Sequence, residues 1–220
     1  MVALATTFLL ALVVGTQEPG TPGGGGLALL AAKALVAELD GRQVVDQAVV
    51  LVAEGEIENV GPQSELEIPE GYAVRDLGPY WIMPGLVDLH THVSGSGIND
   101  TVYQINSGLR VAPTAQPANP RLKRALAAGV TTVLYIPGSG SNMGGQGILM
   151  KTGFPEYERA LVRDPGSLKI AQGDNPTRWG YGMGRLLMNH HLRKVIEQGL
   201  AYARVWDAFE AGTGQEPERD

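Results

Sequence analysis

With 220 residues, 44% of them hydrophobic and 18% charged, the chain is long enough to bury one or two cores. The formal net charge of −6, with 17 Lys and Arg scattered along the sequence, argues against nucleic acid as a partner. The absence of cysteine excludes disulfides and thiolate metal sites, so histidine, carboxylate or a modified side chain would have to hold any metal ion.

The first 26 residues differ in composition from the rest of the chain. An uncharged apolar stretch from Val2 to Val14 resembles the hydrophobic region of a signal peptide, although no positive residues precede it. We therefore expect a signal peptide over residues 1–16 and a secreted or periplasmic protein; the alternative is an irregular start of a cytoplasmic one. The stretch is short of the about 20 residues that span a bilayer, so no stable membrane span is expected after cleavage. Residues 17–26, with four consecutive glycines, are expected to form a flexible linker.

Short β-like runs follow the linker. They are rich in Val, Leu and Ile, and turn residues such as Glu54 and Gly55 separate them, which predicts a hairpin-rich sheet over residues 27–36, 44–52 and 56–61. The β character continues from residue 72 to residue 90, but prolines limit where ladder hydrogen bonds can form. We expect the sheet to break near Pro84, so that residues 27–84 form a small β domain.

After this break the pattern changes to alternating strands and helices. Asn119 and Pro120 are typical of a helix start and Gly129 of its end, and residues 130–138 read as a buried parallel strand. Two more short strands are expected over residues 147–153 and 167–173, with a short helix between them over residues 154–166. A long helix is expected from Gly184 to Ala211, because its apolar residues recur at near-helical spacing.

The segment WIMPGLVDLHTHV, residues 81–93, contains two histidines separated by one residue. In a strand, residues two apart point to the same face, so Asp88, His90 and His92 project together. Two imidazoles in this arrangement can ligate a divalent ion at the end of a strand, and Asp88 can fix an imidazole tautomer from behind. A surface or packing pair is the alternative, but the preceding Pro-Gly and the glycine-rich loop after the pair favour a metal site.

The motif MPGLVDLHTH, preceded by VVLVAEGEIENVGP and VRDLGPYWIMPG, resembles the N-terminal half of amidohydrolase superfamily members of the imidazolonepropionase-like and dipeptidase-like branch. The resemblance implies an α/β fold: a partial TIM (β/α)8 metallo-hydrolase barrel over residues 85–220, preceded by part of a β-sandwich. It further implies a small-molecule substrate and hydrolysis of C–N bonds, in a non-peptide amide, a cyclic amide or a dipeptide, by metal-activated water. His90 and His92 would be metal ligands, with one or two divalent ions, most suitably zinc.

Binuclear members of the family add a carboxylated lysine that bridges the two metals. The resemblance implies Lys169, in SLKIAQG, as this ligand, and Lys151, in GILMKTG, is the rival. An ordinary lysine with a packed stem and a solvated amine is the alternative for both.

Two loops are candidates for substrate binding. The glycine-rich residues 136–147 match no phosphate-binding motif, and as a loop at the active face of the barrel they would offer Asn142 and Gln146 to a substrate. A flexible connection is the alternative. After the Lys169 strand, the resemblance places Arg178 among the substrate contacts.

The resemblance also implies two later histidines and a catalytic aspartate, for which the sequence offers no match, so the catalytic residue stays unassigned. The later histidines, His190 and His191, are adjacent on the predicted long helix and point in different directions. We therefore expect an N-terminal portion that is inactive alone, completed by a C-terminal half or by association with further copies. The alternative is a non-catalytic fragment that retains at most metal binding or an interaction surface.

Overall fold

The computed structural model of the protein describes residues 25–37, 41, 43–178 and 184–218. The chain divides into two units, Met1–Leu86 and Val87–Asp220, a boundary close to the break expected at Pro84. The predicted signal peptide, and all of the predicted linker except Gly25 and Gly26, lie outside the described residues.

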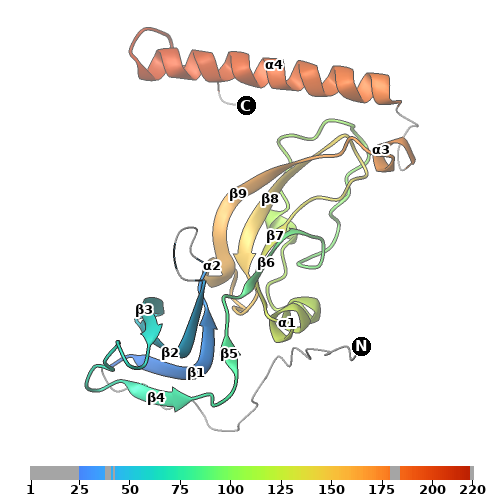
Figure 1. Cartoon of the computed structure of the whole chain (residues 1–220). Coiled ribbons are helices and arrows are strands. Elements are labelled where there is room, and N and C mark those ends of the chain that lie inside the picture. Colours follow the sequence, from blue (N-terminus) through green and yellow to red (C-terminus); the bar gives the residue numbers. More distant parts are fainter. Residues whose placement is uncertain (1–24, 38–40, 42, 179–183, 219–220) are drawn as a thin grey trace. The chain divides into compact units, whose positions relative to one another are not determined.

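The first unit contains a five-stranded sheet in the order β3-β2-β1-β4, with β5 also paired to β1 (Figure 1). Strand β2 is antiparallel to both of its neighbours, β1 and β3, whereas β4 and β5 run parallel to β1. The hairpin between β2 and β3 turns at Glu54 and Gly55, both with positive φ, as a two-residue turn requires. These strands confirm the predicted β runs: β1 Leu27–Leu35, β2 Val44–Ala53, β3 Glu56–Pro62, β4 Ala73–Asp76 and β5 Trp81–Ile82.

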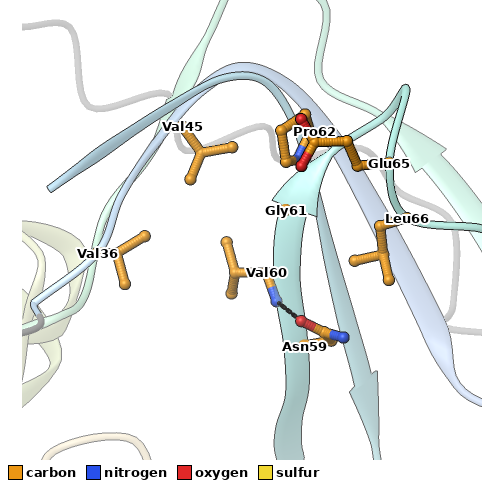
Figure 2. A pocket seen from close by; sticks show the side chains of 8 residues that line it. All are labelled: Val36, Val45, Asn59, Val60, Gly61, Pro62, Glu65 and Leu66. Carbon is orange, nitrogen blue, oxygen red and sulfur yellow. Dashed lines mark hydrogen bonds between the residues drawn. The ribbon is translucent and has the colours of Figure 1, made fainter. Parts of the chain in front are cut away.

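Strand β2 is an inner strand of this sheet and is apolar on both faces. Val45 and Val50 pack into one buried cluster, and Val49 and Leu51 into another. An open hollow on this unit is shown in Figure 2, with Val36 and Val60 among the side chains around it. Asn59, also at the hollow, accepts a hydrogen bond from the backbone N–H of its neighbour Val60. The hollow combines aliphatic side chains with the polar Asn59 and Glu65, and its lining residues include no group of metal ligands.

The second unit is built on a four-stranded sheet in the order β6-β7-β8-β9, in which β8 and β9 lie side by side along much of their length (Figure 1). Its elements are β6 Leu86–Thr91, the 3-10 helix Ala112–Thr114, α1 Pro120–Ala127, β7 Val130–Tyr135, β8 Met143–Lys151, α2 Tyr157–Ala160, β9 Leu161–Ile170, α3 Asn175–Arg178 and α4 Arg185–Glu210.

Helix α1 crosses from β6 to β7 and begins as predicted. The side chain of Asn119 accepts a hydrogen bond from the backbone N–H of Arg121 at 2.8 Å, and Pro120 is the first helical residue. The ends of β6 and β7 meet, because the N–H of Ile136 donates to the carbonyl of Thr91 at 3.2 Å. The crossover therefore brings the end of β7 next to the two histidines at the end of β6.

The later part of the sheet differs from the expected strand–helix alternation. Strand β8 is antiparallel to both β7 and β9, and it includes the glycines that were expected in a loop. Helix α2 covers four residues, and the rest of the helix expected over residues 154–166 is mostly in β9. The connections explain this: seven residues separate β7 from β8, whereas a parallel crossover needs about a dozen or more.

Helix α4 confirms the long helix predicted between Gly184 and Ala211. Met188 is buried, while Leu186 and most of the other large apolar side chains of the helix are exposed. In the part of the chain that the structure describes, no helix combines the length and the apolar character needed to cross a membrane.

Tyr135 gives the second unit an alkaline pH dependence. The ring is fully buried, its hydroxyl lies 3.0 Å from the hydroxyl of Thr114, and burial raises the pKa of the phenol. The unfolded chain therefore loses the phenolic proton first, so the free energy of unfolding falls as the pH rises above the unfolded-state pKa of about 10. We expect Tyr135→Phe to lower the free energy of unfolding by about 1 kcal/mol at neutral pH. The variant should also show a smaller decrease in this free energy at alkaline pH. Urea unfolding between pH 7 and 11 measures both effects, and an unchanged alkaline slope would contradict the assignment.

Candidate metal centre

The end of β6 presents two imidazoles side by side. The ring centroids of His90 and His92 are 5.3 Å apart, with planes at 75°. Thr91, between them, is buried, and its carbonyl anchors the residue after β7. His90 is exposed and His92 is half-buried, so both rings are open to a ligand while the backbone that carries them is held.

The carbonyl of Ile136 orients the ring of His92. Nδ1 of His92 lies 3.0 Å from this oxygen, and because a carbonyl only accepts, Nδ1 must carry the proton. The lone pair of His92 is then on Nε2, the nitrogen that remains free to bind a metal. Sequence reasoning missed Ile136; its position directly after the strand next to β6 was the available signal.

Lys169 reaches the same place from β9. Its side chain is buried, 7% exposed, and its Nζ lies 3.3 Å from Nε2 of His90. Burial lowers the pKa of the Lys169 amine. The positive charge of Lys169, more than burial or the neighbouring His92, lowers the pKa of the His90 imidazole, with Asp88 opposing. Both shifts favour the uncharged forms, and the neutral imidazole is the form that ligates a metal.

The rival lysine lies elsewhere. Lys169 pairs with Gly145 near the beginning of β8, whereas Lys151 is the last residue of that strand. The Nζ of Lys151 donates to the hydroxyl of Thr132 at 3.3 Å, near the beginning of β7. Of the two candidates, the structure brings Lys169 to His90 and leaves Lys151 at the opposite end of β8.

Asp88 contacts the backbone of its neighbour. Its Oδ1 accepts a hydrogen bond from the backbone N–H of His90 at 2.9 Å, so the carboxylate stabilises the backbone of the residue that carries the imidazole. Its role in fixing an imidazole tautomer stays a prediction.

The predicted substrate-binding residues are spread over the unit. Asn142 is buried; its amide donates to the carbonyl of Ala171 at 2.9 Å, and its Oδ1 has no hydrogen-bond partner among the described residues. Gln146 donates from its side chain to the carbonyl of Ser107 at 3.2 Å. Arg178 is exposed at the end of α3, 3.9 Å from the carboxylate of Asp174.

Two imidazoles and one amine make up the chemical groups gathered here. Over residues 25–37, 41, 43–178 and 184–218, no three or more His, Cys, Asp and Glu side chains gather in a way that could hold a metal ion. A protonated lysine repels a cation, but carboxylation of its amine replaces that positive charge with a carboxylate. With that modification, the two imidazoles and the carboxylate could occupy two or three coordination positions of a divalent ion that prefers nitrogen and oxygen ligands.

The chain resembles known hydrolases in both sequence and fold. No protein-family model matches it. It is 29% identical over 198 residues to amidohydrolase tasK of Hapsidospora irregularis, a match that covers 75% of this chain and 20% of that protein. It is 31% identical over 124 residues to imidazolonepropionase of Pseudomonas syringae pv. tomato, covering 46% of this chain and 31% of the relative.

The crystal structure of an amidohydrolase from Thermotoga maritima MSB8 superposes with a TM-score of 0.72 at 28% identity, covering 87% of this chain and 52% of that chain. The chain thus spans less than a third of the two curated relatives and about half of the solved structure. In both sequence and fold, these matches support an amidohydrolase superfamily member, over part of the length of the relatives.

Proposed function

We propose that the chain is part of a metal-dependent hydrolase that cleaves C–N bonds other than peptide bonds, in a small substrate such as a linear or cyclic amide. The observation that carries the proposal is that His90 and His92, at the end of β6, lie beside Lys169 of β9, which is 79 positions after His90 in the sequence. Two relatives named as an amidohydrolase and an imidazolonepropionase support the class of reaction.

In this proposal the second unit is the beginning of a (β/α)8 barrel, and the first unit contributes to a β-sandwich. The strand–helix–strand segment β6-α1-β7 supports the first part, because it ends at the candidate metal centre, as the active face of a barrel does. The antiparallel pair β8-β9 would be an elaboration that carries Lys169 to this face.

The residues of the centre take defined roles. His90 and His92 would hold the metal through Nε2, and Lys169 would ligate it as a carboxylated amine. A bound divalent ion, for which zinc is the best fit, supplies Lewis acidity and an activated water. The Ile136 carbonyl keeps the proton of His92 on Nδ1, and Lys169 favours the neutral form of His90 until the metal binds. We propose that Asn142, Gln146 and Arg178 contact the substrate, and that Asp88 supports the centre.

Turnover is proposed to need more than this chain, because we assign no proton-transferring residue to it. Strand β6 is at the edge of its sheet, and its Val87 and Leu89 are 56% and 64% exposed, so a further segment could pair with this edge and cover these side chains. A complementing C-terminal half or another copy of the chain would cover it. We also propose export, on the apolar segment at residues 2–14.

Zinc binding tests the proposal, with the two lysines as a matched pair. In bicarbonate buffer we expect Lys169→Ala to weaken zinc binding at least about tenfold, because the carboxylated amine is lost as a ligand. Lys151→Ala should bind zinc like the unmodified protein, since its amine lies at the other end of β8. Zinc per chain is measured by equilibrium dialysis and elemental analysis.

Equal zinc binding by the two lysine variants would remove Lys169 from the centre. Absence of zinc binding in the unmodified protein would favour the second candidate, a non-catalytic fragment of a hydrolase. That candidate is supported by the small number of metal-ligating side chains gathered in the described part of the chain.

A further inference from the structure

We infer that Gly144 and Gly147 of β8 are positioning residues for the metal centre. Because they lack side chains, the segment formed by residues 136–138, here called the crossing segment, lies directly on β8. There it brings the Ile136 carbonyl to His92, and a side chain at Gly144 would meet both this segment and the stem of Lys169. The inference rests on the proposed function only for its consequence on metal binding, because the seating of the imidazole is a property of the metal-free protein.

Gly147 is in contact with the start of the crossing segment. A Cβ at this position would lie 2.6 Å from the carbonyl oxygen of Tyr135 and 2.8 Å from Cγ2 of Ile136. It would also lie 2.8 Å from Oγ of Ser167 on β9. Carbon atoms do not approach a backbone oxygen this closely, so a methyl group must shift the backbone at Tyr135 and the side chain of Ile136. The carbonyl of Ile136, which accepts from Nδ1 of His92, directly follows the shifted peptide group.

Gly144 is in contact with the end of the crossing segment. A Cβ here would lie 3.0 Å from the carbonyl oxygen of Gly138, 3.1 Å from Cβ of Pro137 and 3.4 Å from Cγ of Lys169. These contacts are tighter than ordinary packing but less severe than those at Gly147. A methyl group would therefore press on the stem of Lys169, the side chain that reaches His90.

The crossing segment is also held on its other side. The N–H of Gly138 donates to the carbonyl of Ile98 at 2.9 Å, and the N–H of Gly140, just beyond it, donates to Oδ1 of Asn99 at 3.2 Å. Its beginning is tied to β6 through the bond from Ile136 to Thr91. With both sides held, a displacement caused by a new methyl group is passed on to the His92 and Lys169 contacts.

The variants Gly147→Ala and Gly144→Ala test this, and two other glycines provide controls. A Cβ at Gly108 would meet nothing within 4 Å, so Gly108→Ala tests the substitution itself. Gly145 has a φ of +108°, and its Cβ would lie 2.5 Å from the carbonyl of Leu109, away from the crossing segment. Gly145→Ala therefore strains β8 on a side away from Ile136, and it reports the effect of a purely structural change on the His92 tautomer.

The readout is the tautomer of His92 in the metal-free protein, measured from 15N spectra of histidine-labelled chain at a pH where the ring is neutral, and assigned with His92→Ala. We expect the unmodified protein, Gly108→Ala and Gly145→Ala to show the proton on Nδ1. Gly147→Ala should lose this pattern because the Ile136 acceptor has moved. Gly144→Ala should lose the nuclear Overhauser contacts between Lys169 and the His90 ring. If Gly147→Ala does not fold, Gly144→Ala still tests the inference.

Zinc affinity is the second readout. We expect it to fall by about tenfold in Gly147→Ala, because the metal ligand His92 loses its hydrogen bond to the Ile136 carbonyl. The inference is overturned if Gly147→Ala and Gly144→Ala keep the wild-type spectra, or if Gly145→Ala changes them equally. If the spectra change as expected but the unmodified protein binds no zinc, the positioning role stands and the proposed function fails.

Discussion

Replacing both His90 and His92 with alanine should weaken zinc binding by more than about 100-fold, the largest functional effect expected in this chain. Loss of a single outer-sphere partner of a metal ligand costs about 10- to 100-fold, so removing two ligands should exceed that range. The two rings lie 5.3 Å apart at the end of one strand, and the double substitution removes both at once.

The second histidine pair of the chain provides a matched control. His190 and His191 are adjacent on α4, with ring centroids 6.0 Å apart, so His190→Ala/His191→Ala removes the same number of imidazoles. We expect this variant to bind zinc like the unmodified protein in equilibrium dialysis. Equal loss in both double variants would show that the imidazoles bind zinc nonspecifically, and it would leave β6 without a metal centre.

Leu122→Ala should lower the free energy of unfolding of the second unit by about 2–5 kcal/mol, the largest stability effect expected. Leu122 is the buried residue of α1 and is fully enclosed, in the same cluster as Val133, Tyr135 and Ile148 of the sheet. Truncation removes apolar contacts and leaves a cavity, since neighbours in a helix and a sheet relax only partly.

Leu126→Ala is the control, because Leu126 lies one turn further along α1 and is 39% exposed. It should cost clearly less than Leu122→Ala. Urea unfolding followed by circular dichroism compares the two variants, with separate transitions fitted for the two units where they occur. Equal losses would mean that α1 does not pack against the sheet through Leu122.

Local signals predicted a large part of the fold. The Asn119–Pro120 start, the Glu54–Gly55 turn and the apolar runs of the first unit each depend on residues within a few positions, and each appears in the structure. The direction of β8 and β9 was missed because glycine-rich residues were assigned to a loop. The lengths of the connections, which rule out parallel crossovers, were the signal that could have corrected this.

The sequence by itself determined that His90 and His92 lie at the end of a strand and that the chain resembles amidohydrolases, because strand alternation and motif spacing are properties of adjacent residues. Only the tertiary structure decided which lysine lies beside His90 and which carbonyl meets His92. Those contacts join β6 to the end of β7 and to β9. They depend on strand order and register, which arise from packing between residues far apart in the chain.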